Sequence, residues 1–146
     1  MTYLRRSIGL ACGLAVLCCL LACGAIQQAA KDALDAQKLG SLYTEYASAN
    51  NQKGPADADA WAKWAEKNNK SADDVALINQ AKAGGKYTFY WNVDMGKLPG
   101  PANSTVIGYE NKVTAGPTGM VIMADGVKVE AMSPDQFKAA KKADGK

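Results

Sequence analysis

A change of hydrophobic period at Gly84-Gly85 is the feature that most limits the fold of this chain. Before this pair, apolar residues recur at the spacing of amphipathic helices. After it, apolar and polar residues alternate, which is typical of half-buried strands. Helices followed by a run of strands predict an α+β fold. We expect N-terminal helices packed on a small antiparallel β-meander of about four strands, with a C-terminal helix.

The first expected helix runs from Ala25 to about Asn50, and its apolar residues approximate one helical face. Gly40 lies inside it and weakens it by about 1 kcal/mol relative to alanine. The segment 50–55 ends the helix, because its Asn and Gly residues suit a left-handed backbone and its Pro cannot continue a helix.

Two shorter helices are expected before the glycine pair. Asp57 or Asp59 caps the first of them, and Trp61 and Trp64 share its inner face. Ser71 caps the other. We expect the tryptophan pair to pack against the strand that carries the next aromatic residues of the chain.

The alternating half of the chain predicts four strands, over residues 87–93, 105–110, 119–124 and 127–131. Asp125-Gly126 separates the last two and is a strong signal for a hairpin turn. In the last strand, Val127, Val129 and Ala131 face one way, and Lys128 and Glu130 face the other.

A final helix is expected to begin at Ser133. Ser133 and Gln136 have the spacing of a capping box, and Pro134 fits the first helical turn. Phe137 is expected to pack on the sheet, and the tail is expected to fray from about Ala143.

The N-terminus has the layout of a secretory signal. Arg5 and Arg6 precede an apolar run over Ile8–Ala22, about 15 residues long. A spanning helix needs roughly 20 residues, whereas the apolar region of a signal peptide needs about 7–15. Length therefore favours a cleaved signal peptide over residues 1–22 and a single domain over residues 23–146.

All four cysteines lie at or before Cys23, so residues 24–146 can hold no disulfide framework. The run ends Leu20-Leu21-Ala22-Cys23-Gly24, which resembles a bacterial lipobox. This resemblance implies a lipoprotein: cleavage before Cys23, lipidation of its sulfur and palmitate-like acylation of its amine. Two or more chains hold a protein stably at a membrane. Ordinary signal cleavage and an uncleaved short anchor are the alternatives.

Gly24 follows the cysteine where an Asp would mark retention at the inner membrane. By resemblance to lipoprotein sorting, this implies an outer-membrane lipoprotein of the cell envelope that faces the periplasm. Of the 17 basic residues, 15 remain without Arg5 and Arg6, against 14 acidic ones. A charge so near zero gives no signal for nucleic acid. The chain has no histidine, which excludes Ser-His-Asp triads and HExxH zinc sites.

Three segments carry a family resemblance: QKLGSLYTEYASANNQKGPADADAW (37–61), NSTVIGYE (103–110) and GMVIMADGVKVEAMSPDQF (119–137). Together they resemble the globular part of bacterial pilin- and pseudopilin-like proteins, especially an uncharacterised subgroup. Pilins keep a long apolar helix after cleavage, but this chain turns polar directly after Gly24. The resemblance therefore implies a pilin-like head on a lipid anchor at Cys23, a non-enzymatic interaction or assembly module. Its partner would be an unidentified envelope protein or polymer.

The acidic residues have structural explanations. Asp57, Asp59, Asp73 and Asp74 lie at expected helix starts, where carboxylates cap the helix. Asp57 and Asp59 alone are a weak pattern for calcium, so we expect no metal and no cofactor. A carboxylate-only glycosidase would need two carboxyl groups about 5–10 Å apart in a cleft.

Aromatic residues offer the best candidate surface for recognition. Tyr90 lies on the strand face opposite the expected core, and Tyr109 is expected nearby. Exposed aromatic rings can stack on sugars or peptides. A small carbohydrate- or ligand-binding lipoprotein domain is therefore the alternative to the interaction module.

Overall fold

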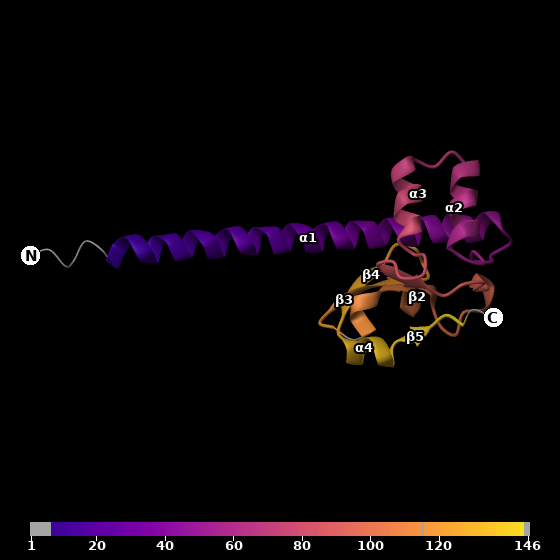
Figure 1. Ribbon diagram of the computed structural model, residues 1–146. Coiled ribbons are helices and arrows are strands. Elements are labelled where there is room, and N and C mark those ends of the chain that lie inside the picture. Colours follow the sequence, from indigo (N-terminus) through magenta and orange to yellow (C-terminus); the bar gives the residue numbers. More distant parts are fainter. Residues whose placement is uncertain (1–6, 115, 145–146) are drawn as a thin grey trace, which may run out of the picture. The chain divides into compact units, whose positions relative to one another are not determined.

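The computed structural model describes the backbone of residues 7–114 and 116–144, and the side chains of residues 26–114 and 116–144. The chain divides into two units, residues 1–32 and 33–146, and we call the second unit the head. Helix α1 (Ser7–Ala49) begins in the first unit and ends in the head. The α+β class is confirmed, because the head combines helices with a small antiparallel sheet and a C-terminal helix (Figure 1).

The part of α1 inside the head supplies the first core residues of the fold. Ala36, Leu39, Tyr43 and Ala47 recur at helical spacing and are almost fully buried. The helix ends at Ala49, as expected, and Asn51 and Gln52 follow with φ of 55° and 63°. These left-handed residues turn the chain away from the helix axis.

Gly40 allows close packing at this point of α1, a role that its low helix propensity alone does not indicate. A Cβ at Gly40 would lie 2.8 Å from Ile122 Cγ2 and 3.1 Å from the carbonyl oxygen of Gly126. Gly126 has φ of +72°, and a Cβ there would lie 2.4 Å from Thr44 Oγ1. The two glycines therefore let α1 approach the turn between the last two strands of the meander.

Polar side chains cap the first turns of the next two helices, as expected. The Asp57 carboxylate accepts the Ala60 N–H (2.7 Å) and caps α2 (Ala58–Lys67). Ser71 and Asp74 form a capping box at the start of α3 (Ala72–Asn79). In both cases the polar side chain satisfies a backbone N–H that the first helical turn leaves free.

The sheet is an antiparallel meander in the order β1-β2-β3-β4, which confirms the expected arrangement. Its strands are β1 (Tyr87–Phe89), β2 (Thr105–Glu110), β3 (Gly119–Met123) and β4 (Val129–Met132). Asp125-Gly126 turns the chain between β3 and β4. The Asp125 carboxylate accepts the N–H groups of Val127 and Lys128, at 3.1 and 2.9 Å.

Side chains on the two faces of the sheet enter two separate cores. Ile122 belongs to the larger core, with residues of α1, α2 and α3. Its neighbours Val121 and Met123 belong to the smaller core, which also contains Phe137 from α4 (Pro134–Ala139). The expected packing of Phe137 on the sheet is confirmed. The sheet therefore separates the first three helices from α4 (Figure 1).

Two expectations at the edge of the sheet are wrong. The strand predicted over 87–93 ends at Phe89, because Asn92 adopts φ of 57° and directs the chain into a loop. Ala143, where fraying was expected to begin, is fully buried, and its N–H donates to the Val106 carbonyl (2.8 Å). The preceding β5 (Lys141–Lys142) pairs in parallel with β2 beyond the end of β1.

Candidate functional site

Cys23 is the site residue that the sequence indicates most strongly. It falls in the helical backbone of α1, but its side chain lies outside the described residues. The side chains of the apolar run Ile8–Ala22 also lie outside the described residues. No helix in the described part of the chain combines the length and apolar character that a membrane span needs.

Tyr90 and Tyr109 are neighbours, as expected, but neither is freely exposed. Their ring centroids lie 6.2 Å apart, and Tyr109 also packs on Phe137 at 4.6 Å. Burial raises the pKa of Tyr90 to about 12, so its hydroxyl stays protonated at neutral pH. Both rings are half-buried in contact with the smaller core. They offer the edge of an aromatic cluster and not an open stacking platform.

The tryptophans contribute mainly to the larger core. Trp61 is fully buried and contacts Phe89 and Trp91, with ring centroids 5.1 and 6.4 Å away. The expected packing against the aromatic strand is thus confirmed for Trp61. Trp64 is only partly buried and packs on Tyr46 at 5.3 Å. These contacts leave little aromatic surface for a sugar.

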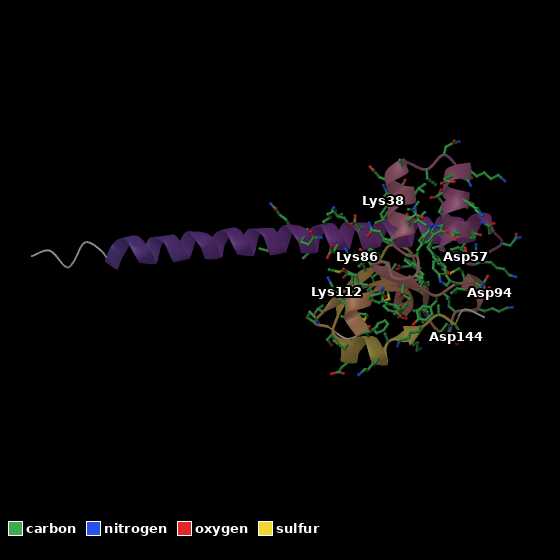
Figure 2. The ribbon with its side chains drawn as sticks, viewed as in Figure 1. Lys38, Asp57, Lys86, Asp94, Lys112 and Asp144 are labelled. Atoms are coloured by element: carbon green, nitrogen blue, oxygen red, sulfur yellow. The ribbon has the colours of Figure 1, made fainter. Side chains whose placement is uncertain are left out.

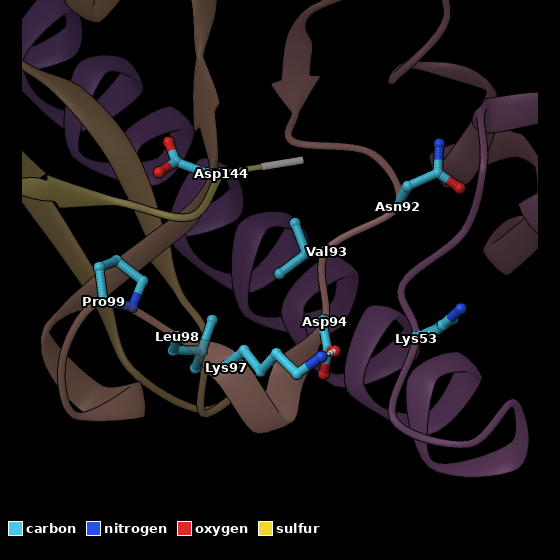
Figure 3. Close-up of a pocket in the computed structure, with 8 residues that line it drawn as sticks. All are labelled: Lys53, Asn92, Val93, Asp94, Lys97, Leu98, Pro99 and Asp144. Atoms are coloured by element: carbon cyan, nitrogen blue, oxygen red, sulfur yellow. Dashed lines mark ion pairs between the residues drawn. The ribbon is translucent and has the colours of Figure 1, made fainter. Parts of the chain in front are cut away.

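A pocket of about 480 Å³ lies between two loops that sequence reasoning did not connect (Figure 3). Backbone hydrogen bonds join the loops: Gly54 N–H donates to Val93 O, and Asn92 N–H donates to Pro55 O, both at 2.8 Å. The residues that line the pocket are Lys53, Asn92, Val93, Asp94, Lys97, Leu98, Pro99 and Asp144.

The pocket carries charges of both signs beside an apolar wall. Lys97 Nζ lies 3.3 Å from Asp94 Oδ2, and Asp94 Oδ1 accepts the Gly96 N–H at 3.0 Å. Asp144 stands across the pocket from Asp94 in Figure 3. Asp94 is thus already engaged by a cation and by a backbone donor. With lysines, carboxylates and an apolar wall, the pocket suits a small polar ligand.

Positive-φ residues occur in the two loops that form this pocket. Asn92 lines it, and Asn51 and Gln52 directly precede its lining residue Lys53. Non-glycine residues with such φ values cost free energy and often gather at binding sites. The sequence indicated a turn at the Asn, Gly and Pro residues of segment 50–55. It did not indicate that this loop pairs with a second loop some 40 residues away.

Glu110 is a buried carboxylate whose environment the sequence did not reveal. It is 2% exposed, and Oε2 accepts the Met120 N–H at 3.0 Å. Lys112 Nζ lies 2.9 Å from Oε2 and Lys86 Nζ lies 3.5 Å from Oε1 (both lysines are labelled in Figure 2). Because Glu110 is paired with two lysines and accepts a backbone N–H of β3, its role is to link β2 to β3 structurally.

Three other acidic residues act as the sequence indicated. Asp57, Asp74 and Asp125 each accept backbone N–H groups at helix starts or the hairpin turn. Lys38 Nζ also lies 2.6 Å from Asp74, and this hydrogen bond holds the pKa of Asp74 below its usual value. Within residues 26–114 and 116–144, no three metal-ligating side chains gather.

Comparison with protein-family models, with curated proteins and with solved structures found no match to this chain. Its function must therefore be argued from its own residues and geometry.

Proposed function

We propose that this chain is a lipid-anchored protein of the bacterial cell envelope whose head is a non-enzymatic interaction module. The observation that carries the proposal is the position of Cys23 between an apolar run and a polar helical segment that leads into the head. Residues 26–31 of that segment are all exposed, and the first buried apolar residue of the described chain is Ala36. A lipid site thus directly precedes a spacer and a folded unit.

Tethering gives such a head its mechanism. Acyl chains on Cys23 would confine the head to one membrane surface, where its concentration near membrane-bound partners rises steeply. The Gly24 that follows favours the outer membrane, with the head in the periplasm. A modest intrinsic affinity would then suffice for binding.

The fold supports a pilin-like head. A helix packs along an antiparallel meander through Gly40 and Gly126, and two short helices lie between it and the first strand. This agrees with the resemblance in segments 37–61 and 119–137. Because the chain is polar from Gln27 to Lys31, the head would be presented on a lipid anchor in place of a filament helix.

The anchor is tested by labelling cells with an alkyne analogue of palmitate and measuring the intact mass of the protein. We expect acyl incorporation and a mature N-terminus at Cys23, both abolished by Cys23→Ser. Cys19→Ser is the matched control and should be acylated like wild type. Fractionation alone is insufficient, because an unprocessed variant keeps the run Ile8–Ala22 and can stay in the membrane. An unmodified polypeptide that begins at Met1 would refute the anchor.

The interaction role is tested by crosslinking and mass spectrometry in native envelopes. We expect wild type to crosslink through the head to a defined partner, and Cys23→Ser to lose most of that product because its local concentration falls. Crosslinks that are equally frequent in both proteins would contradict tethering as the mechanism.

A second candidate function, small-ligand binding, is favoured by the pocket at Lys53. The side chains of Lys53 and Asp144 offer opposite charges to a ligand that carries both. Titration of the protein with amino acids and short peptides, followed by NMR, tests this. Shifts confined to the pocket and lost in Lys53→Gln would support it, and their absence at millimolar ligand would exclude it.

A further inference from the structure

β4 is an edge strand of the meander. Its partner is β3, with Val121 opposite Glu130 and Ile122 opposite Val129. In the described residues no strand pairs with the other side of β4. An open edge exposes a row of backbone donors and acceptors that can pair with another chain.

The hydrogen-bond pattern tells which residues point their backbone groups outward. Met123 N–H donates to Lys128 O at 3.0 Å, so Lys128 turns its backbone toward β3. Orientation alternates along an antiparallel strand, so Glu130 also turns toward β3. Val129 and Ala131 therefore direct their N–H and C=O groups to the open side.

The side chains of this edge divide into two chemically distinct rows. Val129 lies opposite Ile122 on the larger-core face, and Ala131 shares that face. Val127 is 65% exposed and lines a shallow groove with Leu34 of α1, which is 66% exposed. On the opposite face, Lys128 Nζ lies 2.6 Å from Glu130 Oε1. One face of the edge is apolar, and the other carries one charge of each sign.

We propose that this edge pairs with the β4 edge of a second copy of the chain, antiparallel and centred on Val129. In that register Val129 meets Val129 of the copy, so their outward backbone groups form reciprocal hydrogen bonds. Lys128 lies opposite Glu130 of the copy, and Glu130 opposite Lys128. These charged positions are the non-hydrogen-bonded sites, where side chains across the strands approach most closely.

Other registers are less favourable. A pairing centred on Lys128 or on Glu130 puts like charges opposite each other. A centre at Val127 brings the Asp125-Gly126 turn into the pairing. A centre at Ala131 brings in Ser133, whose N–H already donates to Gln136 Oε1 in the capping box. Of these registers, only the centre at Val129 joins opposite charges with apolar partners and places the outward backbone groups of Val129 opposite each other.

The pairing also covers the apolar surface of the edge. Val127, which precedes β4, comes to lie opposite Ala131 of the copy, so these two exposed apolar side chains shield each other. The apolar strip continues onto Leu34 beside Val127. Because the inference rests on the proposed interaction role and names its partner, it is tested separately from the anchor at Cys23.

A disulfide across the two-fold axis tests the register in the full-length protein in its own membrane. Hydrogen-bonded residues of an antiparallel pair have Cα atoms about 5.5 Å apart, within the range of a disulfide. We expect Val129→Cys to give a disulfide-linked dimer under mild oxidation. The matched control is Ala131→Cys, because its two copies lie four residues apart along the strand, roughly 13 Å, and cannot be bridged. Residues 24–146 contain no native cysteine to compete.

Charge reversal in the Val129→Cys background supplies a second test. Lys128→Glu makes the charged face wholly acidic and Glu130→Lys makes it wholly basic, so each alone should give roughly tenfold less disulfide dimer. Co-expression of the two differently tagged chains should restore the dimer as a mixed species. Neither chain regains its internal 128–130 ion pair, so recovery can arise only between chains.

The outcomes separate the possibilities. Dimer from Val129→Cys but not Ala131→Cys, with recovery in the mixed charge variants, supports the proposal. Equal yields from both cysteine variants would indicate random collision and overturn it. A crosslink from Val129→Cys to a different protein would also overturn it, in favour of a strand from that partner. Normal acylation at Cys23 in the same samples would show that such a failure concerns the β4 edge alone.

Discussion

Substitution of Gly40 by alanine tests the closest contact in the head. Alanine normally stabilises the interior of a helix by about 1 kcal/mol relative to glycine. Here its Cβ would lie 2.8 Å from Ile122 Cγ2 and 3.1 Å from Gly126 O, where carbon contacts are optimal at about 3.5–4.0 Å. Relieving an overlap of this kind in a packed core costs typically about 1–3 kcal/mol. We expect Gly40→Ala to destabilise the head by about 1 kcal/mol, opposite in sign to propensity.

Urea unfolding followed by tryptophan fluorescence measures this effect, since Trp61 is fully buried in the same core as α1. The matched control is Ser48→Ala, at an exposed position of the same helix, which should gain about 0.5 kcal/mol from propensity alone. If Gly40→Ala stabilised the protein as Ser48→Ala does, α1 could not approach the hairpin turn as closely as described.

Three further predictions concern other contacts of the head. Trp61→Ala should cost about 3–5 kcal/mol by leaving a cavity among Tyr43, Phe89 and Trp91, measured by thermal and urea unfolding; a loss below 1 kcal/mol would contradict its full burial. Asp74, whose pKa Lys38 lowers from its usual 3.8, stabilises the fold above that pH, and the contribution is lost as pH falls through the lowered value. Unfolding measured between pH 7 and 2 should therefore lose part of its pH dependence in Asp74→Asn, and an unchanged profile would refute the pairing. Ser133→Ala should cost about 1 kcal/mol by removing the capping box of α4, whereas Ser133→Asp should retain most of the stability.

Local features of this fold were predictable because they depend on neighbours in sequence. The helix starts at Asp57, Ser71 and Ser133 follow from side chains that reach N–H groups within three residues. The hairpin at Asp125-Gly126 likewise follows from turn geometry. Alternation also predicted β2, where both faces of the strand are covered by distinct cores.

Features set by distant parts of the chain were not predictable. The strand over 87–93 ends early because Pro55 and Gly54 bind the backbone at Asn92 and Val93, a pairing that no local pattern encodes. Ala143 lies in a polar C-terminal stretch of the sequence, but its side chain fills a buried position beside Val106. The pocket at Lys53 arises from the same long-range pairing, so its residues carry no common motif.

The contact between Gly40 and Gly126 also bears on how the head folds. The two residues are 86 positions apart (126 less 40), so α1 finds its docking site only after most of the intervening chain has been ordered. Until then the side of α1 at Gly40 stays open to water. We therefore expect docking to be a late event, so that weakening it should speed unfolding far more than it slows refolding.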